Sequence, residues 1–128
     1  MSTLTGAMDV ALGYPFAGVF TNSEDLWKRL KSAGTKAGDR VWRMPLSKDY
    51  KSQIKSDVAD LKNVGGRSAG SCTAAIFLKE FISPLAASEE KNATKQVEVP
   101  FAHIDIAGVF HKRSGPDFLS AGMTGMFL

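Results

Sequence analysis

The stretch that decides the fold is NVGGRSAGSCTAAIFLKEF, residues 63–81, which passes without a break from a glycine-rich loop into an apolar helix. Gly65 and Gly66 admit backbone angles that are closed to other residues. The small residues after them let the start of a helix approach a neighbouring backbone closely. The spacing predicts a helix over 69–82. Its surface is apolar nearly all round, so we expect it to be buried, with most of that surface supplied by Ala75, Phe77, Leu78, Phe81 and Ile82.

Strands and helices alternate along the rest of the chain. Strands are predicted at 3–8, Ala17–Thr21, 40–44 and 101–109. A helix capped by Asn22 or Ser23 and ended by Gly34 follows the second strand, and a helix that begins at Ser47 carries Tyr50 and Ile54 inward. This order predicts an α/β fold, a layered mixed sheet flanked by helices.

Two stretches interrupt that order. Residues 84–100 contain AASEEKNATKQ, a mixture of alanine with polar and charged residues that shows no period, so we expect an exposed loop insertion. The glycine-rich tail is expected to be mostly loop, with one helical turn around 117–120. The whole chain, 1–128, is predicted to form one domain.

Composition narrows the classes of function. The 16 basic and 13 acidic residues are scattered, so no basic stripe indicates nucleic-acid binding. No run approaches 18 apolar residues and no secretory signal opens the chain, which predicts no membrane association and a cytoplasmic protein. The single cysteine, Cys72, fits a reducing compartment. It is either a small buried hydrophobic residue or a reactive thiol.

Polar side chains offer few sites for chemistry. The alternation of FAHIDIAGV puts His103 and Asp105 on one face of a strand, where they are either metal ligands, an acid with its orienting partner, or structural groups hydrogen-bonded within a sheet. Asp57 and Asp60, with Arg67 nearby, are either helix caps and ion-pair partners or general acids and bases.

Nucleotide and nucleophile motifs are not matched. The glycines beside Lys62 fit neither the P-loop nor the dinucleotide pattern, although glycine-rich amides before a helix are able to bind anions. No G-x-S-x-G elbow occurs.

Five blocks in order carry a resemblance. They are LTGAMDVALG at 4–13, GDRVWRMPL at 38–46, the opening stretch at 63–81, AHIDIAG at 102–108 and GMTG at 122–125. Together they resemble the carboxy-terminal part of the catalytic domain of the leucine aminopeptidases, also called cytosol aminopeptidases. The resemblance implies the fold of a truncated catalytic domain of that family.

The resemblance also implies what this chain lacks. The family's two divalent ions, zinc or manganese, are held by residues of a K-x-x-x-x-D stretch, a further aspartate and an N-T-D-A-E-G-R motif, which precede the L-T-G-A block. The family's catalytic lysine and arginine belong to the same segments. This chain is therefore expected to contain no catalytic residue, no metal ligand and no cofactor of its own, and to be inactive alone.

Substrate-binding residues carry over by resemblance. They are Thr3, Leu4 and Gly6 from the L-T-G-A block and Met123 from G-M-T-G. A thioether and an aliphatic side chain suit an apolar pocket, and glycine lets a substrate backbone come close. Core packing is the alternative role for Leu4 and Met123. The family continues G-M-T-G with arginine, proline and a long helix, whereas this chain continues with methionine, phenylalanine and leucine.

Two functions follow as expectations. The first is a fragment of a metallopeptidase that hydrolyses amino-terminal residues from peptides and that forms a homo-oligomer or takes the missing segment from a partner chain. The second is a noncatalytic structural or assembly protein built on the aminopeptidase scaffold. Both predict that the isolated chain aggregates, oligomerises or needs a partner, since open strand edges pair with other chains.

Limited proteolysis tests the predicted insertion. Trypsin should cut first at Lys91 or Lys95, because polar loops without packing contacts open most easily. The fragments are identified by mass spectrometry. First cleavage inside 70–81 would contradict a buried helix there.

Overall fold

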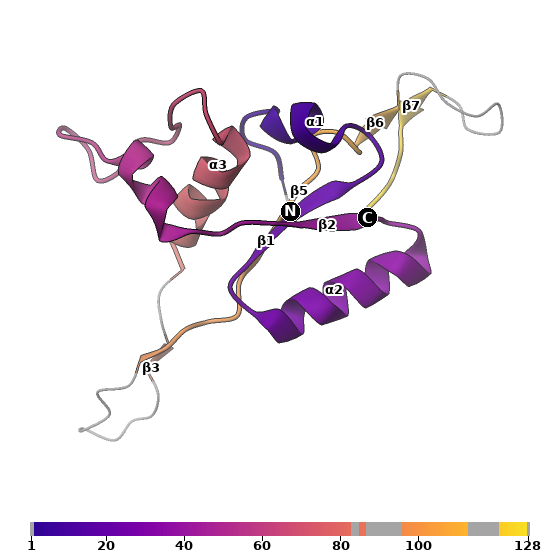
Figure 1. Ribbon diagram of the computed structural model, residues 1–128, viewed down its shortest axis with the longest axis horizontal. Coiled ribbons are helices and arrows are strands. Elements are labelled where there is room, and N and C mark those ends of the chain that lie inside the picture. The colour runs from indigo at the N-terminus through magenta and orange to yellow at the C-terminus, as the bar shows by residue number, and fades with distance from the viewer. Residues whose placement is uncertain (1, 83–84, 87–95, 113–120, 128) are drawn as a thin grey trace.

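The computed structural model describes residues 2–82, 85–86, 96–112 and 121–127 (Figure 1). Its centre is a three-stranded mixed sheet in the order β2-β1-β5. Strand β1 (Ala17–Thr21) pairs in parallel with β2 (Val41–Met44) and antiparallel with β5 (Ala102–Asp105). The predicted mixed α/β fold is confirmed.

Helices cover both faces of this sheet. Helix α2 (Glu24–Ala37) packs on one face, against β1 and β2. The other face carries α1 (Ala7–Leu12), which contacts β1, and α3 (Gly70–Lys79), which contacts β5. The 3-10 helix η1 (Lys48–Ile54) packs against α3. Figure 1 shows α2 on one side of the strands, with α1 and α3 on the other.

The middle strand, β1, is buried along its whole length. Its residues are apolar or small, as expected for a strand that is covered on both faces. Gly18 leaves room for the side chain of Met8 on α1. A Cβ at position 18 would lie only 2.4 Å from Cε and 2.6 Å from Sδ of Met8. Met8 therefore packs directly on the backbone of the strand, within a core cluster formed by Met8, Phe20, Cys72, Ala75 and Ala107.

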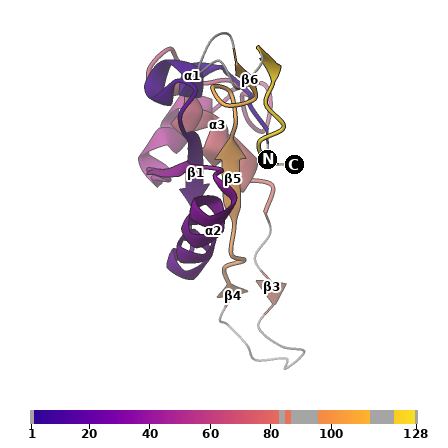
Figure 2. The ribbon, with the colours of Figure 1, turned by 90° about the vertical axis from the view of Figure 1, so that its right-hand side faces the viewer.

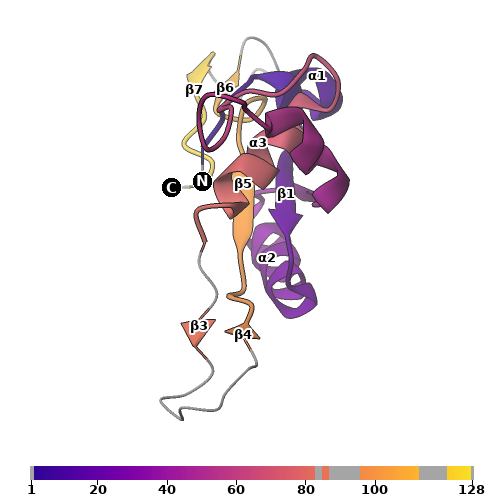
Figure 3. The same cartoon turned by 90° about the vertical axis from the view of Figure 1, so that its left-hand side faces the viewer.

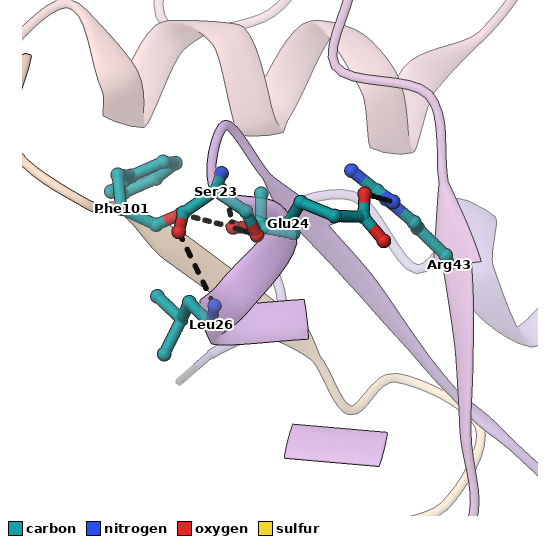
Figure 4. A network of polar contacts seen from close by, with 6 residues as sticks. Ser23, Glu24, Leu26, Arg43 and Phe101 are labelled. Atoms are coloured by element: carbon teal, nitrogen blue, oxygen red, sulfur yellow. Dashed lines mark hydrogen bonds and ion pairs between the residues drawn. The ribbon is translucent and has the colours of Figure 1, made fainter. Parts of the chain in front are cut away.

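Helix α2 begins as predicted and ends later. The Ser23 hydroxyl oxygen accepts a hydrogen bond from the N–H of Leu26 at 3.2 Å. In the first turn, the Glu24 carboxylate forms an ion pair with Arg43 on β2 (Figure 4). Gly34 lies inside the helix, so the predicted end there is wrong. Gly34 is buried against the Asp39 carbonyl, which a Cβ at this position would overlap. The helix ends instead at Gly38, which has a φ of 83°.

Helix α3 confirms the opening stretch in part. The helix is present and Ser71–Ile76 are buried within it, but its carboxy-terminal end is not covered. The helix ends at Lys79, and Phe81 and Ile82 beyond it are 65% and 41% exposed, so the prediction of a buried helix that continues to residue 82 is wrong there. The rings of Phe77 and Phe81 pack edge to face at 5.0 Å, one turn apart.

The strand predicted at 3–8 is not formed. Only Ser2 bridges to Asp105, and the chain then turns through Gly6, at a φ of 69°, into α1. The strand predicted at 40–44 is β2, and that at 101–109 is β5, which stops at Asp105 and continues as a turn. Ser47 caps η1, with Ile54 fully buried as expected.

The predicted insertion 84–100 is described only at its two ends. β3 (Leu85–Ala86) pairs antiparallel with β4 (Gln96–Val97), away from the central sheet (Figure 2). The Asn22 amide donates to the Val99 carbonyl at 2.9 Å, and the Asn22 side-chain oxygen accepts from the N–H of Phe101 at 2.7 Å. These two hydrogen bonds hold residues 99–101, which lead from the insertion into β5, against the end of β1. Residues 87–95 and the helical turn expected around 117–120 lie outside the described residues.

A Gly108→Ala substitution should destabilise the protein by about 1–3 kcal/mol. Gly108 is buried, and a Cβ there would overlap the backbone carbonyl of Gly13, which cannot move like a side chain. The free energy of unfolding is measured with urea. Gly66→Ala is the control, since its Cβ would meet only the side-chain oxygen of Gln53, at 3.3 Å. Equal effects of the two substitutions would contradict the close backbone approach.

Candidate substrate-binding site

The residues Thr3, Leu4 and Gly6 lie on one short segment between the sheet and α1. Ser2 fixes its start, because the Ser2 N–H donates to the Ile104 carbonyl at 3.1 Å and the Ser2 carbonyl accepts from Ile106 at 3.3 Å. Leu4 is 37% exposed, and Thr3 is exposed. The space in front of Gly6 is open, with nothing within 4 Å of a Cβ built there.

Met123 lies on β7 (Gly122–Met123), which pairs antiparallel with β6 (His111–Lys112). Its side chain is 76% exposed. The following residue anchors the strand, because the Thr124 N–H donates to the Phe110 carbonyl at 3.0 Å and the Thr124 hydroxyl donates to the Val109 carbonyl at 2.6 Å. Core packing therefore does not account for Leu4 or Met123 in the described part of the chain.

One turn supports both parts of the candidate site. The turn 106–110 follows β5, and Val109 and Phe110 both donate through their N–H groups to the Ile106 carbonyl. Ser2 bonds to its first residue, and Thr124 bonds to its last two. Figure 3 shows α1, β6 and β7 at the same end of the molecule, opposite β3 and β4. The sequence-predicted residues are thus brought to one end of the sheet.

The pair His103 and Asp105 shares one face of β5, as the alternation predicted, and the structure shows that this face is the buried one. His103 is 3% exposed and Asp105 fully buried, and the His103 ring stacks on Phe20 at 5.9 Å. One Asp105 oxygen accepts from the N–H of Ala107 at 3.1 Å. The other oxygen, and Nε2 of His103, have no partner among the described residues. Burial lowers the pKa of His103, against the opposing charge of Asp105.

These two residues do not make a metal site by themselves. Zinc in proteins takes three or four protein ligands, and the parts of the chain that are described hold no group of three His, Cys, Asp or Glu residues. The described residues therefore do not fit the two-ion centre that the resemblance implies for the family. The expectation that this chain has no metal or catalytic residue remains a prediction.

The other candidate groups lie away from this end of the sheet or in the core. Asp57, Asp60 and Arg67 are exposed and are not among the ion pairs of the described residues. Cys72 is buried in the core. Cys72 raises the pKa of Tyr50 through the negative charge of its thiolate form and through a hydrogen bond with the Tyr50 side chain.

A second surface was not predicted from the sequence. A cavity of about 600 Å3 lies between α2 and β2, and its lining combines aromatic and basic side chains, including Trp27, Arg40 and Trp42. The signal was present in VWRM, residues 41–44, whose alternation puts aromatic and basic side chains on opposite faces of one strand.

Comparison with known proteins identifies the family. The pattern of the cytosol aminopeptidase family, catalytic domain, matches residues 1–128. The chain is 49% identical over 127 residues to the cytosol aminopeptidase of Xenopus tropicalis and 48% identical over 126 residues to that of Homo sapiens. The chain belongs to the cytosol aminopeptidase family.

The match covers little of the relatives' length. In both comparisons 97% of this chain aligns with 22% of the relative. A mutant of tomato leucine aminopeptidase has a similar structure, with a TM-score of 0.71 and 38% sequence identity over 86% of this chain and 19% of that one. The chain therefore spans about a fifth of the relatives it matches. Among the described residues, no helix combines the length and the apolar character needed to cross a membrane.

Acid should destabilise the fold through His103. Because its pKa is lowered below the ordinary value of 6.5, the unfolded state takes up the proton first. The stability is therefore complete above about pH 6.5 and is lost as the pH falls through the folded pKa, by about 1.4 kcal/mol for each unit of pKa. Urea unfolding between pH 7 and 5 measures this slope. His103→Gln should flatten it and His111→Gln, at an exposed site, should not; the reverse result would exclude His103 as the titrating group.

Proposed function

We propose that this chain forms one wall of the substrate pocket of a metal-dependent aminopeptidase, which removes amino-terminal residues from peptides. The observation that carries the proposal is the exposure of Leu4 and Met123 at one end of the sheet, on two segments fixed to the same turn. Family membership supplies the activity. The chain's share of about a fifth of its relatives makes the activity a proposal for this polypeptide.

Each residue of this wall has a physical role in binding. Leu4 and the flexible thioether of Met123 would pack on the side chain of the peptide's first residue. The open space before Gly6 lets the peptide backbone approach, and the exposed hydroxyl of Thr3 offers a hydrogen bond. All four positions act in binding and orientation. Two divalent ions, zinc or manganese, held by residues outside those described, would supply the activation of a water and the polarisation of the scissile carbonyl.

Completion of the site requires groups beyond those described. The wall has no neighbouring cluster of carboxylates, within the described ranges, that would hold the ions. We propose that residues 1–128 act in the cytoplasm as a single partial domain that is inactive by itself and assembles into a homo-oligomer or with a partner chain. A segment outside these residues would supply the metal ligands.

A noncatalytic assembly role is the second candidate. It is favoured by the apolar side chains left uncovered at the end of α3, where Phe81 is 65% exposed and Ile82 is 41% exposed. Such a cluster marks a contact with another surface when it is contiguous. A protein of this kind would hold a stable partner and show no recovered peptidase activity.

Complementation separates the two candidates. The 128-residue chain, desalted and assayed on leucine p-nitroanilide with manganese, should show no hydrolysis and no stoichiometric zinc or manganese. Addition of a family segment that carries N-T-D-A-E-G-R should restore activity. Leu4→Ala and Met123→Ala should each lower kcat/KM about tenfold in the complemented enzyme, since lost apolar contact weakens substrate binding.

The matched control is Val58→Ala. Val58 is 97% exposed on a loop, so the change removes a similar aliphatic group outside the proposed wall. An equal loss of activity for Val58→Ala would contradict the assigned wall. Hydrolysis by the chain alone, with one metal ion held per chain, would refute the dependence on another segment.

A further inference from the structure

A groove follows the outer edge of β2 and draws its lining from both sides of the sheet. Trp27, Lys31 and Thr35 line it from α2, Trp42 lines it from β2, and Phe16 lines it from the position just before β1. The volume is about 600 Å3, within the range of sites that bind peptides or small molecules. None of the proposed pocket residues belongs to the lining. In Figure 1, β2 is the strand that passes between α2 and the helices above it.

The aromatic rings of the groove are held in place by their neighbours. Phe16 and Trp42 pack edge to face with ring centroids 5.9 Å apart, and the Arg40 guanidinium lies 5.0 Å from the Phe16 centroid. Trp42 is nevertheless 58% exposed. Large rings that are fixed and still exposed offer contact area at little cost in conformational entropy, as in many binding surfaces.

The charge of the groove has one sign. Its lining contains Lys31, Arg40 and Arg43 and no carboxylate. Arg43 is engaged by Glu24 at 2.5 Å (Figure 4), whereas Lys31 and Arg40 take part in no ion pair within the described residues. Lys28 and Lys36 on α2 add to the same surface. This charge disfavours a second copy of the chain and favours a partner that carries carboxylates.

The backbone of β2 offers a further set of contacts. The Arg40 carbonyl accepts from the N–H of Ala17, so Arg40, Trp42 and Met44 direct their backbone groups to β1. The alternation then directs the N–H and C=O groups of Val41 and Arg43 outward. Among the described strands, β2 pairs only with β1. An open edge of this kind accepts an added strand.

We propose that this groove binds an extended acidic peptide segment that carries an aromatic or large apolar side chain. The segment adds to β2 through Val41 and Arg43, packs its apolar side chain on Phe16 and Trp42, and places carboxylates beside Lys31 and Arg40. The edge pairing favours a peptide over a nucleotide, which would use the rings and the cations but not the strand.

Fluorescence anisotropy of a labelled peptide tests the proposal. The probe is fluorescein-labelled Glu-Phe-Glu-Phe-Glu, titrated with the protein at low salt. Trp42→Ala should weaken binding about tenfold, and Arg40→Gln and Lys31→Gln about threefold to fivefold each. Lys55→Gln, at an exposed site outside the groove, should leave it unchanged. Circular dichroism is used to check that each variant is folded. If Trp42→Ala does not fold, the two charge variants still test the proposal.

Altered probes separate the other occupants. A Gln-Phe-Gln-Phe-Gln peptide, and a peptide N-methylated on alternate residues to block strand pairing, should bind at least about fivefold more weakly, and 0.3 M salt should weaken the parent peptide. Unchanged affinity of the glutamine peptide would overturn the role of charge. Unchanged affinity of the N-methylated peptide would overturn the strand pairing. Displacement of the peptide by ATP in equimolar amounts would indicate a nucleotide site. Loss of binding as the protein self-associates would assign the groove to a second copy, and no binding of any probe would reject it.

Discussion

The pairing of β5 with β1 is the contact on which the rest of the described structure depends. It joins Gly18–Thr21 to residues about 80 positions later, with Phe20 opposite His103 and Thr21 opposite Ala102. The Thr21 hydroxyl strengthens it by donating to the Phe101 carbonyl at 2.7 Å. Because β5 carries the turn 106–110, this one long-range pairing positions both Ser2 and β7. Loss of the pairing would therefore separate the two parts of the proposed pocket wall, although neither part is in β1.

Burial of His103 and Asp105 limits how this pairing tolerates change. A buried polar atom without a hydrogen bond costs stability, and each of these side chains has one such atom within the described part of the chain. Asp105 recovers part of that cost by accepting from Ala107 at the start of the turn. The pair thus acts on the geometry of the turn and, through His103, on its response to acid. This gives the pattern of His103 and Asp105 a structural role in the sheet and its turn.

The sequence was sufficient for elements whose signals are local. The helix cap, predicted at Asn22 or Ser23 and found at Ser23, the buried strand β1 and the shared face of His103 and Asp105 on β5 depend mainly on neighbouring residues, and these predictions are confirmed. Errors arose where distant contacts decide. The pattern predicts a helix end at Gly34 because it does not show the Asp39 carbonyl that packs against this glycine. It predicts a buried Phe81 because a run of apolar residues does not show whether a neighbour covers each of them.

The candidate site follows the same division. The resemblance identified Thr3, Leu4, Gly6 and Met123 from short motifs, but their common support on the turn 106–110 is visible only in three dimensions. The groove at β2 was missed because its residues come from α2, from β2 and from the loops beside them, so no single stretch of the sequence shows its aromatic and basic side chains together.

The proposed pocket wall and the groove depend on different parts of the fold. The wall is anchored by backbone hydrogen bonds from Ser2 and Thr124 to the end of β5 and its turn, whereas the groove is built on α2 and the far edge strand β2. They share no lining residue. Substitutions at sites without shared partners usually have additive effects, so changes at Trp42 and at Met123 should combine without coupling. A strong coupling between them would indicate that strain at the β2 edge passes through β1 to the turn, since β1 is the only described strand that pairs with both β2 and β5.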